Sequence, residues 1–334
     1  MIFHKIVLEI KRNKLPYYIK NYVRKLIPSI LFQKSLRRKI LSQNEYDIDY
    51  LTSRLNYYNK LSSPKEIGEN AVLLGEMNKI KGSSVYYFDT YEHTRYFKKS
   101  LQANCLFKDV IHIPNVPTLQ KSRPIGDNNE NAVILKLEKK RHFFFVKDPY
   151  QYSQKKDMLI GRGSINAPNS PQPHRVRFME TYFDHPLCDL GQVNKVGGNP
   201  AWLKPKISII DHLKYKFVLS LEGNDVATNL KWIMSSNSIA VMPKPKYETW
   251  FMEGTLIPDF HFILINEDYS DLGKKLQYYI DHPIEAQRIV KNANAYVKQF
   301  LDDKLEDLIS FLVLQKYFYY TNQISDEEYI QLKS

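Results

Sequence analysis

An α/β fold with parallel sheet, divided into two domains, is what this sequence predicts, and three observations lead to it. Apolar runs of strand length alternate with segments of helical spacing through the second half of the chain. The 334 residues exceed the ~100–200 residues that are typical of one domain. A charged fraction of 25%, together with 24 Tyr and 17 Phe, indicates a globular protein and not a disordered one.

The chain holds two cysteines, Cys105 and Cys188, which lie far apart in the sequence. Such a pair implies neither a disulfide framework nor a thiolate zinc site. No run of ~18 or more apolar residues is present, and the N-terminus lacks a cleavable signal with a small-residue cleavage site. We therefore expect a cytoplasmic protein that neither spans a membrane nor is exported.

Most of the net charge of +12 is concentrated in a basic N-terminal arm, residues 1–45. Up to Lys39 the following cations stand against Glu9 alone: Lys5, Lys11, Arg12, Lys14, Lys20, Arg24, Lys25, Lys34, Arg37, Arg38 and Lys39. Apolar and aromatic residues are interleaved with them, which favours docking on an anionic membrane surface, where each Lys or Arg adds ~1 kcal/mol. A solvated basic helix packed on the body is the alternative. Nucleic-acid binding is disfavoured because the charge does not spread over a face.

The first half of the chain gives short and mixed patterns. Pro16 and Pro28 divide the arm, and the first globular domain is expected to begin near Tyr46. The elements predicted after it are a helix or strand from Asn70, a turn at Gly82–Ser84, a strand at Val85–Phe88, a helix entered through Asp89 and Thr90, a strand and Pro-marked loop in 109–125, and two strand-like runs in 131–148.

The second half gives a regular alternation. The predicted elements are a strand that ends at Ile160, a Gly/Pro/Asn loop, a helix from about His174, a second loop at Gly197–Pro200, a helix, strand, helix and strand in 207–245, and a strand followed by longer helices in 260–301. In a parallel sheet of this kind, ligands bind beyond the carboxyl ends of the strands.

The stretch "SLEGNDVATNLKW", Ser220 to Trp232, is a candidate phosphate loop. Gly223 follows an apolar strand, and the spacing of apolar residues predicts a helix that begins directly after Asn224 and Asp225. The N–H groups and the dipole of a helix start favour an anion. The alternative is that Asn224 or Asp225 is only an N-cap.

Longer motifs resemble glycosyltransferase family 90, which includes the Rumi-type protein O-glucosyltransferases, fungal capsule xylosyltransferases and bacterial enzymes that modify lipopolysaccharide. The segment from Asp211 to Leu272, which begins "DHLKYKFVLSLEGND", is similar to the C-terminal signature of that family. Upstream, "MLIGRGS" resembles its aromatic-Arg-Gly-Ser strand end. The resemblance extends over about residues 85–300.

This resemblance implies a GT-B-like architecture, with two Rossmann-like domains facing across a cleft and a metal-independent, inverting transfer from a nucleotide sugar. We expect a basic amphipathic arm at 1–45, an acceptor domain at 46–155, a donor domain at 156–300, and C-terminal helices at 301–334 that pack back on the acceptor domain. No cofactor and no metal are expected. The carboxylates of Asp47 and Asp49 are interpreted as a helix entry instead of a metal pair.

The resemblance also assigns residues to the donor. Arg162 is expected near the donor phosphates, Asp211 beside the nucleoside, and the loop from Gly223 around the diphosphate. The full predicted donor set is Arg123, Arg162, Gly163, Ser164, Asp211, Gly223, Asn224, Asp225, Ala227, Thr228, Asn229 and Lys231. Rumi-type members have an Arg two residues before the helix Lys, where this chain has Asn229. The charge of the diphosphate must then be met by Arg162, Arg123, Lys231 or backbone N–H groups. An ordinary surface ion pair is the alternative for Arg123.

An inverting transfer needs a carboxylate base near the acceptor hydroxyl. Asp89 follows "SSVYYF" and Asp148 follows "RHFFFVK", so each is expected at the carboxyl end of a first-domain strand. Asp89 fits the family order, in which the base comes early in the first domain, and Asp148 is the alternative. Helix capping or an Asp-Pro turn is the structural interpretation of both.

Weaker candidates for contact with the sugars are His93, Tyr247, Glu248 and Trp250. Flat aromatic faces beside carboxylates suit saccharides, but a packed aromatic turn and a hydrogen-bonded structural histidine explain the same residues.

The resulting hypothesis is an enzyme that moves glucose, xylose or a similar sugar from a UDP-sugar to a lipid-linked saccharide in lipopolysaccharide or lipooligosaccharide synthesis. We expect it on the inner face of the plasma (inner) membrane, without a nucleic-acid partner. The alternative is a non-catalytic glycan- or nucleotide-binding protein on the same scaffold.

Overall fold

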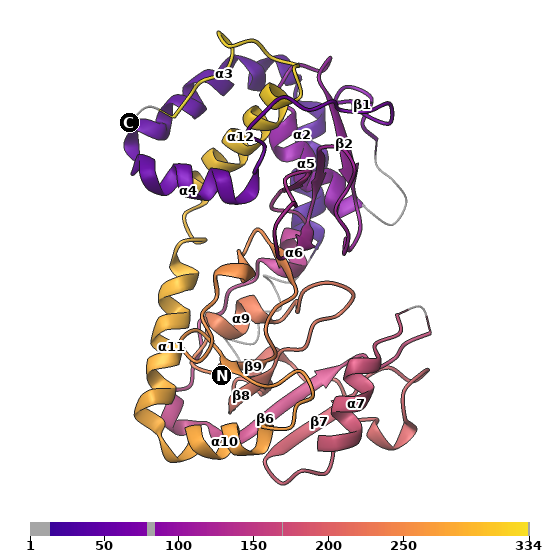
Figure 1. The fold of residues 1–334 in the computed structure, drawn as a ribbon, viewed down its shortest axis with the longest axis vertical. Helices are drawn as coiled ribbons and strands as arrows, with labels where there is room; N and C mark the ends of the chain where they lie inside the picture. Colours follow the sequence, from indigo (N-terminus) through magenta and orange to yellow (C-terminus); the bar gives the residue numbers. More distant parts are fainter. Residues whose placement is uncertain (1–13, 79–83, 169, 333–334) are drawn as a thin grey trace. The chain divides into compact units, whose positions relative to one another are not determined.

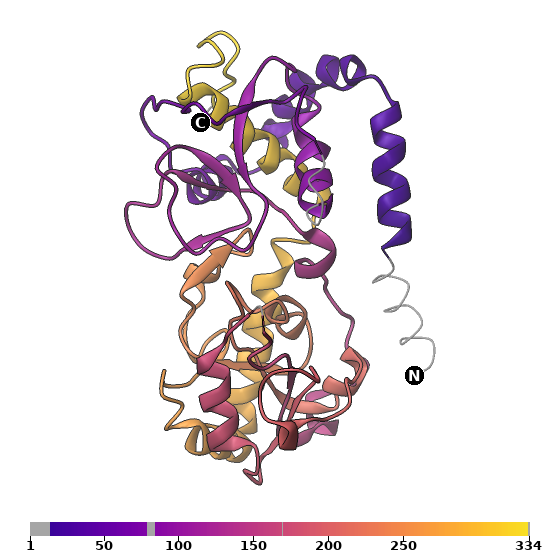
Figure 2. The same ribbon diagram turned by 90° about the vertical axis from the view of Figure 1, so that its right-hand side faces the viewer.

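The computed structural model describes residues 14–78, 84–168 and 170–332, which form two compact units (Figure 1, Figure 2). The middle unit consists of residues 142–245 and 255–299. The terminal unit consists of the described residues of 14–141, 246–254 and 300–332. The described part of the basic arm belongs to the terminal unit. Among the described residues, none of the helices combines the length and the apolar character that a membrane crossing requires.

Five parallel strands form the sheet of the middle unit. In chain order they are β6 (Lys156–Gly163), β7 (Cys188–Gln192), β8 (Tyr215–Leu219), β9 (Ile239–Met242) and β11 (Ile263–Leu264). Their order across the sheet is β11-β9-β8-β6-β7, so the first strand lies between the second and the third. This is the doubly wound order 2-1-3-4-5. The predicted α/β class with parallel sheet is confirmed.

Helices connect these strands as the periodicity predicts. They are α7 (Pro173–Tyr182), α8 (Ile209–His212), α9 (Leu230–Met234), α10 (Leu272–Asp281) and α11 (Pro283–Lys298), with one 3-10 turn, η3 (Pro200–Trp202). Proline at the first turn suits the starts of α7 and α11, because the first N–H groups of a helix have no partner within it. The buried residues Ala286, Ile289, Val290, Ala293 and Val297 keep the i, i+3, i+4 spacing of an amphipathic helix.

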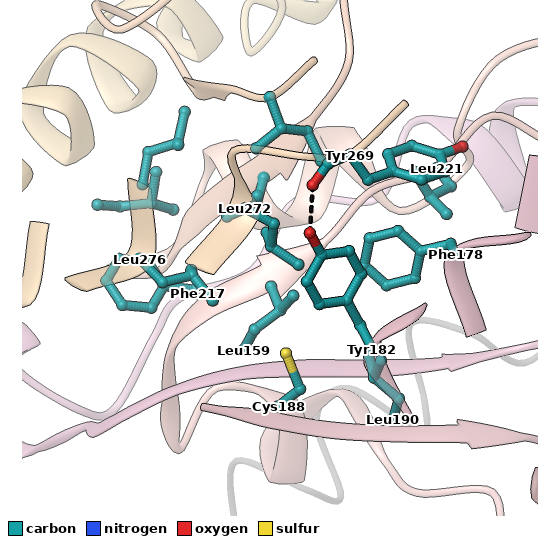
Figure 3. Close-up of a cluster of buried hydrophobic side chains, with 14 of the residues drawn as sticks. Leu159, Phe178, Tyr182, Cys188, Leu190, Phe217, Leu221, Tyr269, Leu272 and Leu276 are labelled. Carbon is teal, nitrogen blue, oxygen red and sulfur yellow. Dashed lines mark hydrogen bonds between the residues drawn. The ribbon is translucent and has the colours of Figure 1, made fainter. Parts of the chain in front are cut away.

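The core of the middle unit joins the sheet to α7 and α10 (Figure 3). Phe178 packs edge-on against Tyr269, with ring centroids 4.9 Å apart. The Tyr182 hydroxyl donates a hydrogen bond to the Tyr269 carbonyl oxygen, drawn as the dashed line in Figure 3. Because these residues fix α7 from its C-terminal half, they also fix the position of its first turn, which carries Arg175.

The terminal unit contains a smaller mixed sheet, β1-β2-β3-β5, and a separate two-stranded ribbon, β4 with β10. The strands are β1 (Val72–Leu73), β2 (Gln102–Leu106), β3 (Thr118–Gln120), β4 (Ser122–Pro124), β5 (Ala132–Ile134) and β10 (Tyr247–Thr249). Strands β2, β3 and β5 are parallel, whereas β1 is antiparallel to β2. Strand β10 brings the chain back from the middle unit to pair antiparallel with β4.

Helices surround this sheet (Figure 1). They are α2 (Leu15–Leu26), α3 (Ser29–Leu41), α4 (Ile48–Tyr58), α5 (Ser84–Thr94), α6 (Lys139–His142) and α12 (Asp303–Tyr320), and the chain has further 3-10 turns η1 (Ser42–Glu45), η2 (Tyr152–Gln154) and η4 (Glu253–Thr255). The break between α2 and α3 falls at Pro28, as predicted. Asp47 caps α4 by accepting a hydrogen bond from the Tyr50 amide, which confirms its interpretation as a helix entry.

Buried charges hold α4, α12 and β10 together within the terminal unit. The Glu306 carboxylate of α12 accepts hydrogen bonds from Arg54 at 2.7 Å and from Lys136 at 2.8 Å. It also accepts one from the Trp250 indole at 2.6 Å. Burial by itself would raise the pKa of Glu306, but the charges of Lys136 and Arg54 lower it, so the carboxylate stays ionised.

Two predicted strands are wrong. Residues 85–88 lie inside helix α5, where the Thr90 hydroxyl donates to the carbonyl of Tyr86, four residues earlier. A short apolar run fits a buried helix as well as a strand, so periodicity cannot distinguish them. The run that ends at Asp148 has no sheet partner either, because the Val146 amide donates to the Ser235 hydroxyl instead.

Candidate functional site

The carboxyl ends of β6 and β8 form the topological switch point of the middle unit. These two strands are neighbours, yet the chain leaves β6 toward β7 on one side and β8 toward β9 on the other. Doubly wound sheets bind their ligands at such a point. Gly163 ends β6 here and Ser164 follows it, while Gly223 follows β8, so two separate parts of the predicted donor set come together.

Arg175, which the sequence analysis missed, joins the two strand ends. Its guanidinium donates three hydrogen bonds to backbone carbonyl oxygens: to Ser164 at 3.0 Å, to Leu221 at 2.9 Å and to Glu222 at 3.0 Å. A Cβ atom added to Gly163 or Gly223 would lie 3.6 Å from a nitrogen of the same guanidinium. The two glycines therefore flank Arg175.

The charge of Arg175 has no carboxylate partner. Within the residues that the structure describes, it makes no ion pair, and burial lowers its pKa to about 10. Carbonyl dipoles solvate a guanidinium only partly, so a bound anion would be a favourable further partner. The signal in the sequence was weak: Arg175 is one of two arginines in the first turns of a helix that follows the Gly/Pro/Asn loop.

Arg162, the predicted phosphate ligand, has its charge balanced by Asp189. Its guanidinium donates to the Asp189 carboxylate at 2.7 Å, and only 8% of the side chain is exposed. Burial would raise the pKa of Asp189, but hydrogen bonds from Arg162, Tyr215 and Lys204 lower it to about 2. The ion pair therefore persists over the physiological pH range.

In the predicted phosphate loop, the helix starts later in the chain than we expected. Helix α9 begins at Leu230 and has five residues, so the prediction that it begins directly after Asp225 is wrong. The Asn229 carboxamide explains the delay, because it donates to the Leu219 carbonyl at 2.8 Å and accepts from the Ser220 hydroxyl at 3.2 Å. Side-chain bonds of this kind compete with helix formation.

The members of this loop differ in exposure. Asn224 is exposed and accepts a hydrogen bond from the Ser170 hydroxyl at 2.6 Å, while Gly223, Thr228 and Asn229 are half-buried. The remaining predicted donor residues of the loop and of α9, which are buried, are Asp225, Ala227 and Lys231. The open part of the loop is therefore the stretch beside Arg175.

Asp211, predicted to contact the nucleoside, closes the capping box of α8. It accepts a hydrogen bond from the Ser208 hydroxyl at 2.6 Å and pairs with Lys214 at 2.7 Å. Hydrogen bonds from Lys214 and Ser208 lower its pKa to about 2. A contact with the nucleoside stays a prediction.

Arg123 and Glu248 form a fully buried ion pair that joins β4 to β10 in the terminal unit. The two side chains are 2.7 Å apart, and Arg123 also donates to the carbonyls of Tyr57 and Ala132. Arg123 has no exposed surface, so the interpretation as a surface ion pair is wrong. Its role toward the donor stays a prediction.

The aromatic residues next to Glu248 are packed in the interior. Trp250 is fully buried and stacks on Tyr58, with ring centroids 3.8 Å apart. Tyr247 is half-buried. This arrangement favours the packed aromatic turn over stacking on a sugar.

Asp89, the predicted base, lies in the middle of α5 and is 2% exposed. Its carboxylate accepts hydrogen bonds from the Tyr17 hydroxyl at 2.7 Å and from the Lys139 amide at 2.9 Å. Burial raises its pKa to about 6. His93, one turn later, is also buried and bonds to Asp307 at 2.9 Å, and burial lowers its pKa.

Asp148, the alternative base, holds a turn. Its carboxylate accepts from Lys155 at 2.7 Å and from the backbone amides of Tyr150 at 2.9 Å and Asn237 at 2.8 Å. Its side chain is 2% exposed. These contacts agree with the Asp-Pro turn interpretation.

A charged cluster that the sequence analysis missed lies at the carboxyl ends of the parallel strands in the terminal unit. Lys121 directly follows β3, Asp109 follows β2, and Glu138 follows β5. Lys121 is buried and pairs with Asp109, while its amine lies 3.9 Å from the Glu138 carboxylate. Glu138 has a left-handed backbone, with φ 54°. The cluster therefore lies at the edge of the sheet where parallel strands can bind a ligand.

Comparison with known proteins gives a consistent set of relatives. The model of Glycosyl transferase family 90 matches residues 175–322. The O-glucosyltransferase LpsA of Dichelobacter nodosus is 38% identical over 309 residues, which cover 92% of this chain and 95% of that protein. Protein O-glucosyltransferase 3 of Rattus norvegicus is 28% identical over 112 residues, 33% of this chain and 22% of that protein. Protein O-glucosyltransferase 2 of Danio rerio is 28% identical over 95 residues, 28% of this chain and 19% of that protein.

Proposed function

The chain belongs to glycosyltransferase family 90, and from that premise we propose that it transfers glucose, or a similar sugar, from a UDP-sugar to a saccharide acceptor with inversion at the anomeric carbon. The observation that carries the proposal is the uncompensated guanidinium of Arg175 at the switch point between β6 and β8. The diphosphate of UDP is an anion, which a guanidinium at such a point favours.

In this proposal the middle unit binds the donor. The backbone from Gly163 to Ser164 and from Gly223 to Asn224 contacts the diphosphate, and Arg175 supplies the charge that the departing UDP requires. Arg162 orients the end of β6 through Asp189. Asp211 remains the proposed nucleoside contact. No metal is required, because a protein cation takes its place.

The terminal unit supplies the acceptor side and the base, in a GT-B arrangement of the two units. We retain Asp89 as the proposed base, because a carboxylate whose pKa burial raises to about 6 accepts a proton more readily near neutral pH than an ordinary one. Its hydrogen bond from Tyr17 must open or be shared with the acceptor hydroxyl.

The acceptor is proposed to be a lipid-linked saccharide of lipopolysaccharide synthesis, reached at the inner face of the membrane. Helix α2 supports this proposal with an exposed apolar stripe on a basic helix. The stripe, with each side chain at least half exposed, consists of Leu15, Ile19, Val23 and Leu26. Lys20 and Lys25, also exposed, flank it and favour anionic headgroups.

The test is incubation of the full chain with a panel of UDP-sugars, with and without saccharide acceptor extracts, while UDP release is measured. We expect release with one donor, UDP-glucose first, and faster release with acceptor. Tight binding of UDP without turnover of any donor, even with acceptor, would instead support a non-catalytic binding protein. The burial of Asp89 and Asp148 is also compatible with that alternative.

A further inference from the structure

The terminal unit has a groove of about 470 Å³ between α3, the chain after α5 and the segment that follows α12. Its walls are largely apolar and include Ile30, Leu36, Phe97, Leu101, Ile324 and Ile330. The volume lies within the ~300–1,000 Å³ of small-molecule sites. We propose that this groove binds the acyl chain of an anionic membrane lipid, which goes beyond the transfer reaction and rests on the proposed membrane location.

Gln315, one of the residues that line the groove, has a buried acceptor atom. Gln315 is 3% exposed, and its Oε1 has no hydrogen-bond partner among the described residues. Its Nε2 donates to the Glu328 carbonyl at 3.2 Å, which fixes the amide. Burying an acceptor without a partner is unfavourable, so a ligand with a hydroxyl or amide donor beside its chain complements the site.

The charges at the mouth favour an anionic headgroup. Lys34 and Arg37 lie one turn apart on α3, both are exposed, and neither makes an ion pair within the described part of the chain. Lys98, by contrast, is paired with Glu328. Glu327 is the remaining acidic residue of the lining, so two available cations face one carboxylate.

Exposed apolar residues lead along the chain from the end of α2 to the groove. Leu26 is 82% exposed at the end of α2, Ile30 and Leu31 are more than half exposed at the start of α3, and Ile30 lines the groove. A bilayer that receives the α2 stripe would therefore present its lipids to the mouth of the groove. Together with Lys34 and Arg37 at the mouth, these exposed apolar residues favour a membrane lipid as the occupant.

The experiment measures binding of 1-lauroyl lysophosphatidic acid to the full chain below its micellar concentration, by calorimetric titration. This probe has one acyl chain, one free hydroxyl and one phosphate. Inorganic phosphate tests the headgroup alone, and dodecyl maltoside tests a chain without charge. We expect binding of the lysophosphatidic acid at least tenfold tighter than that of either control.

Three variants test the groove. Lys34→Glu with Arg37→Glu should weaken lysophosphatidic acid binding at least tenfold, and Ile330→Trp should abolish it by filling the groove. Gln315→Leu should weaken it severalfold while leaving dodecyl phosphate, which lacks the hydroxyl, unchanged. Lys195→Glu with Lys206→Glu, exposed in the middle unit, is the matched charge control.

The results of these experiments distinguish a lipid from the other possible occupants of the groove. Unchanged binding in all groove variants, or equal binding of inorganic phosphate, overturns the proposal. If removal of residues 1–13 increases lysophosphatidic acid binding, the chain's own N-terminus is the occupant of the groove. If the groove variants differ from the unchanged protein in molecular mass in solution, a second copy of the chain is the occupant. UDP release from the donor is measured in parallel, and its loss or retention tests the transferase proposal independently.

Discussion

Arg175 is a cation whose hydrogen-bond acceptors in the structure are all uncharged carbonyls. Arg54, Arg123 and Arg162 are different, because each of them has a carboxylate partner. A charge without a partner is costly to bury unless a ligand or another function compensates. This contrast is the reason for proposing Arg175 as a binding residue.

We expect Arg175→Ala to weaken UDP binding about 10- to 100-fold, because a charge-assisted hydrogen bond contributes ~1.5–3 kcal/mol. Gly223→Val should have a similar effect, since its branched side chain would press on the guanidinium. Arg177→Ala is the control, because Arg177 is exposed on the same helix and bonds to the Glu267 carbonyl. Calorimetric titration with UDP is the measurement. Normal UDP affinity in folded Arg175→Ala would remove the diphosphate from this site.

Asp89 gives a prediction about pH. If it is the base, transfer requires the ionised carboxylate, so kcat/KM should fall as the pH drops through about 6. The Tyr17 hydrogen bond stabilises the ionised form, and Tyr17→Phe should therefore move this decline to higher pH.

Single variants complete this test. Asp89→Asn should keep UDP affinity and lose transfer ~10²–10⁴-fold, whereas Asp148→Asn should be active or unstable. An active Asp89→Asn enzyme, together with an inactive Glu138→Gln enzyme, would move the base to the charged cluster of Asp109, Lys121 and Glu138.

At the scale of elements, helix α2 combines an attached face and an open face. Its attached face contacts α5 through Tyr17 with Asp89 and Arg24 with Glu92. Its open face is the apolar stripe. Because the attached face contributes to the fold, deletion of the whole arm would confound loss of membrane binding with loss of stability.

Point changes on the stripe avoid this problem. We expect Ile19→Asn with Val23→Asn and Leu26→Asn to reduce sedimentation with anionic vesicles more than tenfold at an unchanged Tm, since the substituted side chains are exposed. Ile284→Asn in α11, 83% exposed, is the matched control. Binding of the unchanged protein should weaken as salt is raised. Equal sedimentation of the triple variant and the control would show that α2 is not the anchor.

At the scale of the whole molecule, the two units have different sheets and different charged sites. The middle unit has a doubly wound sheet with a cation at its switch point, and the terminal unit has carboxylates beside its parallel strands. Within the described residues, no group of three or more His, Cys, Asp or Glu side chains could hold a metal ion.

We therefore expect transfer to continue at an unchanged rate in excess EDTA, because Arg175 and backbone N–H groups supply the stabilisation that a divalent cation gives in metal-dependent enzymes. The measurement is UDP release with EDTA, with added Mg²⁺ as the comparison. Loss of activity in EDTA that Mg²⁺ restores would contradict metal independence.

The sequence by itself determined the α/β class, the family and most elements between β6 and α11, because long alternating segments leave a periodic apolar pattern and the motifs are contiguous. It missed the strands β7 and β10, and it placed the start of α9 too early. The family resemblance assigned Gly163, Ser164 and Gly223 to the donor, and the structure brings them to the ends of the neighbouring strands β6 and β8. Only the tertiary structure decided that residues 85–88 are helical, since a short apolar run takes the form that its neighbours bury. It also decided which charges are compensated, pairing Arg162 with Asp189 and Arg123 with Glu248 while leaving Arg175 among carbonyls. Ion pairing depends on distances between residues far apart in the chain, and no local pattern encodes them.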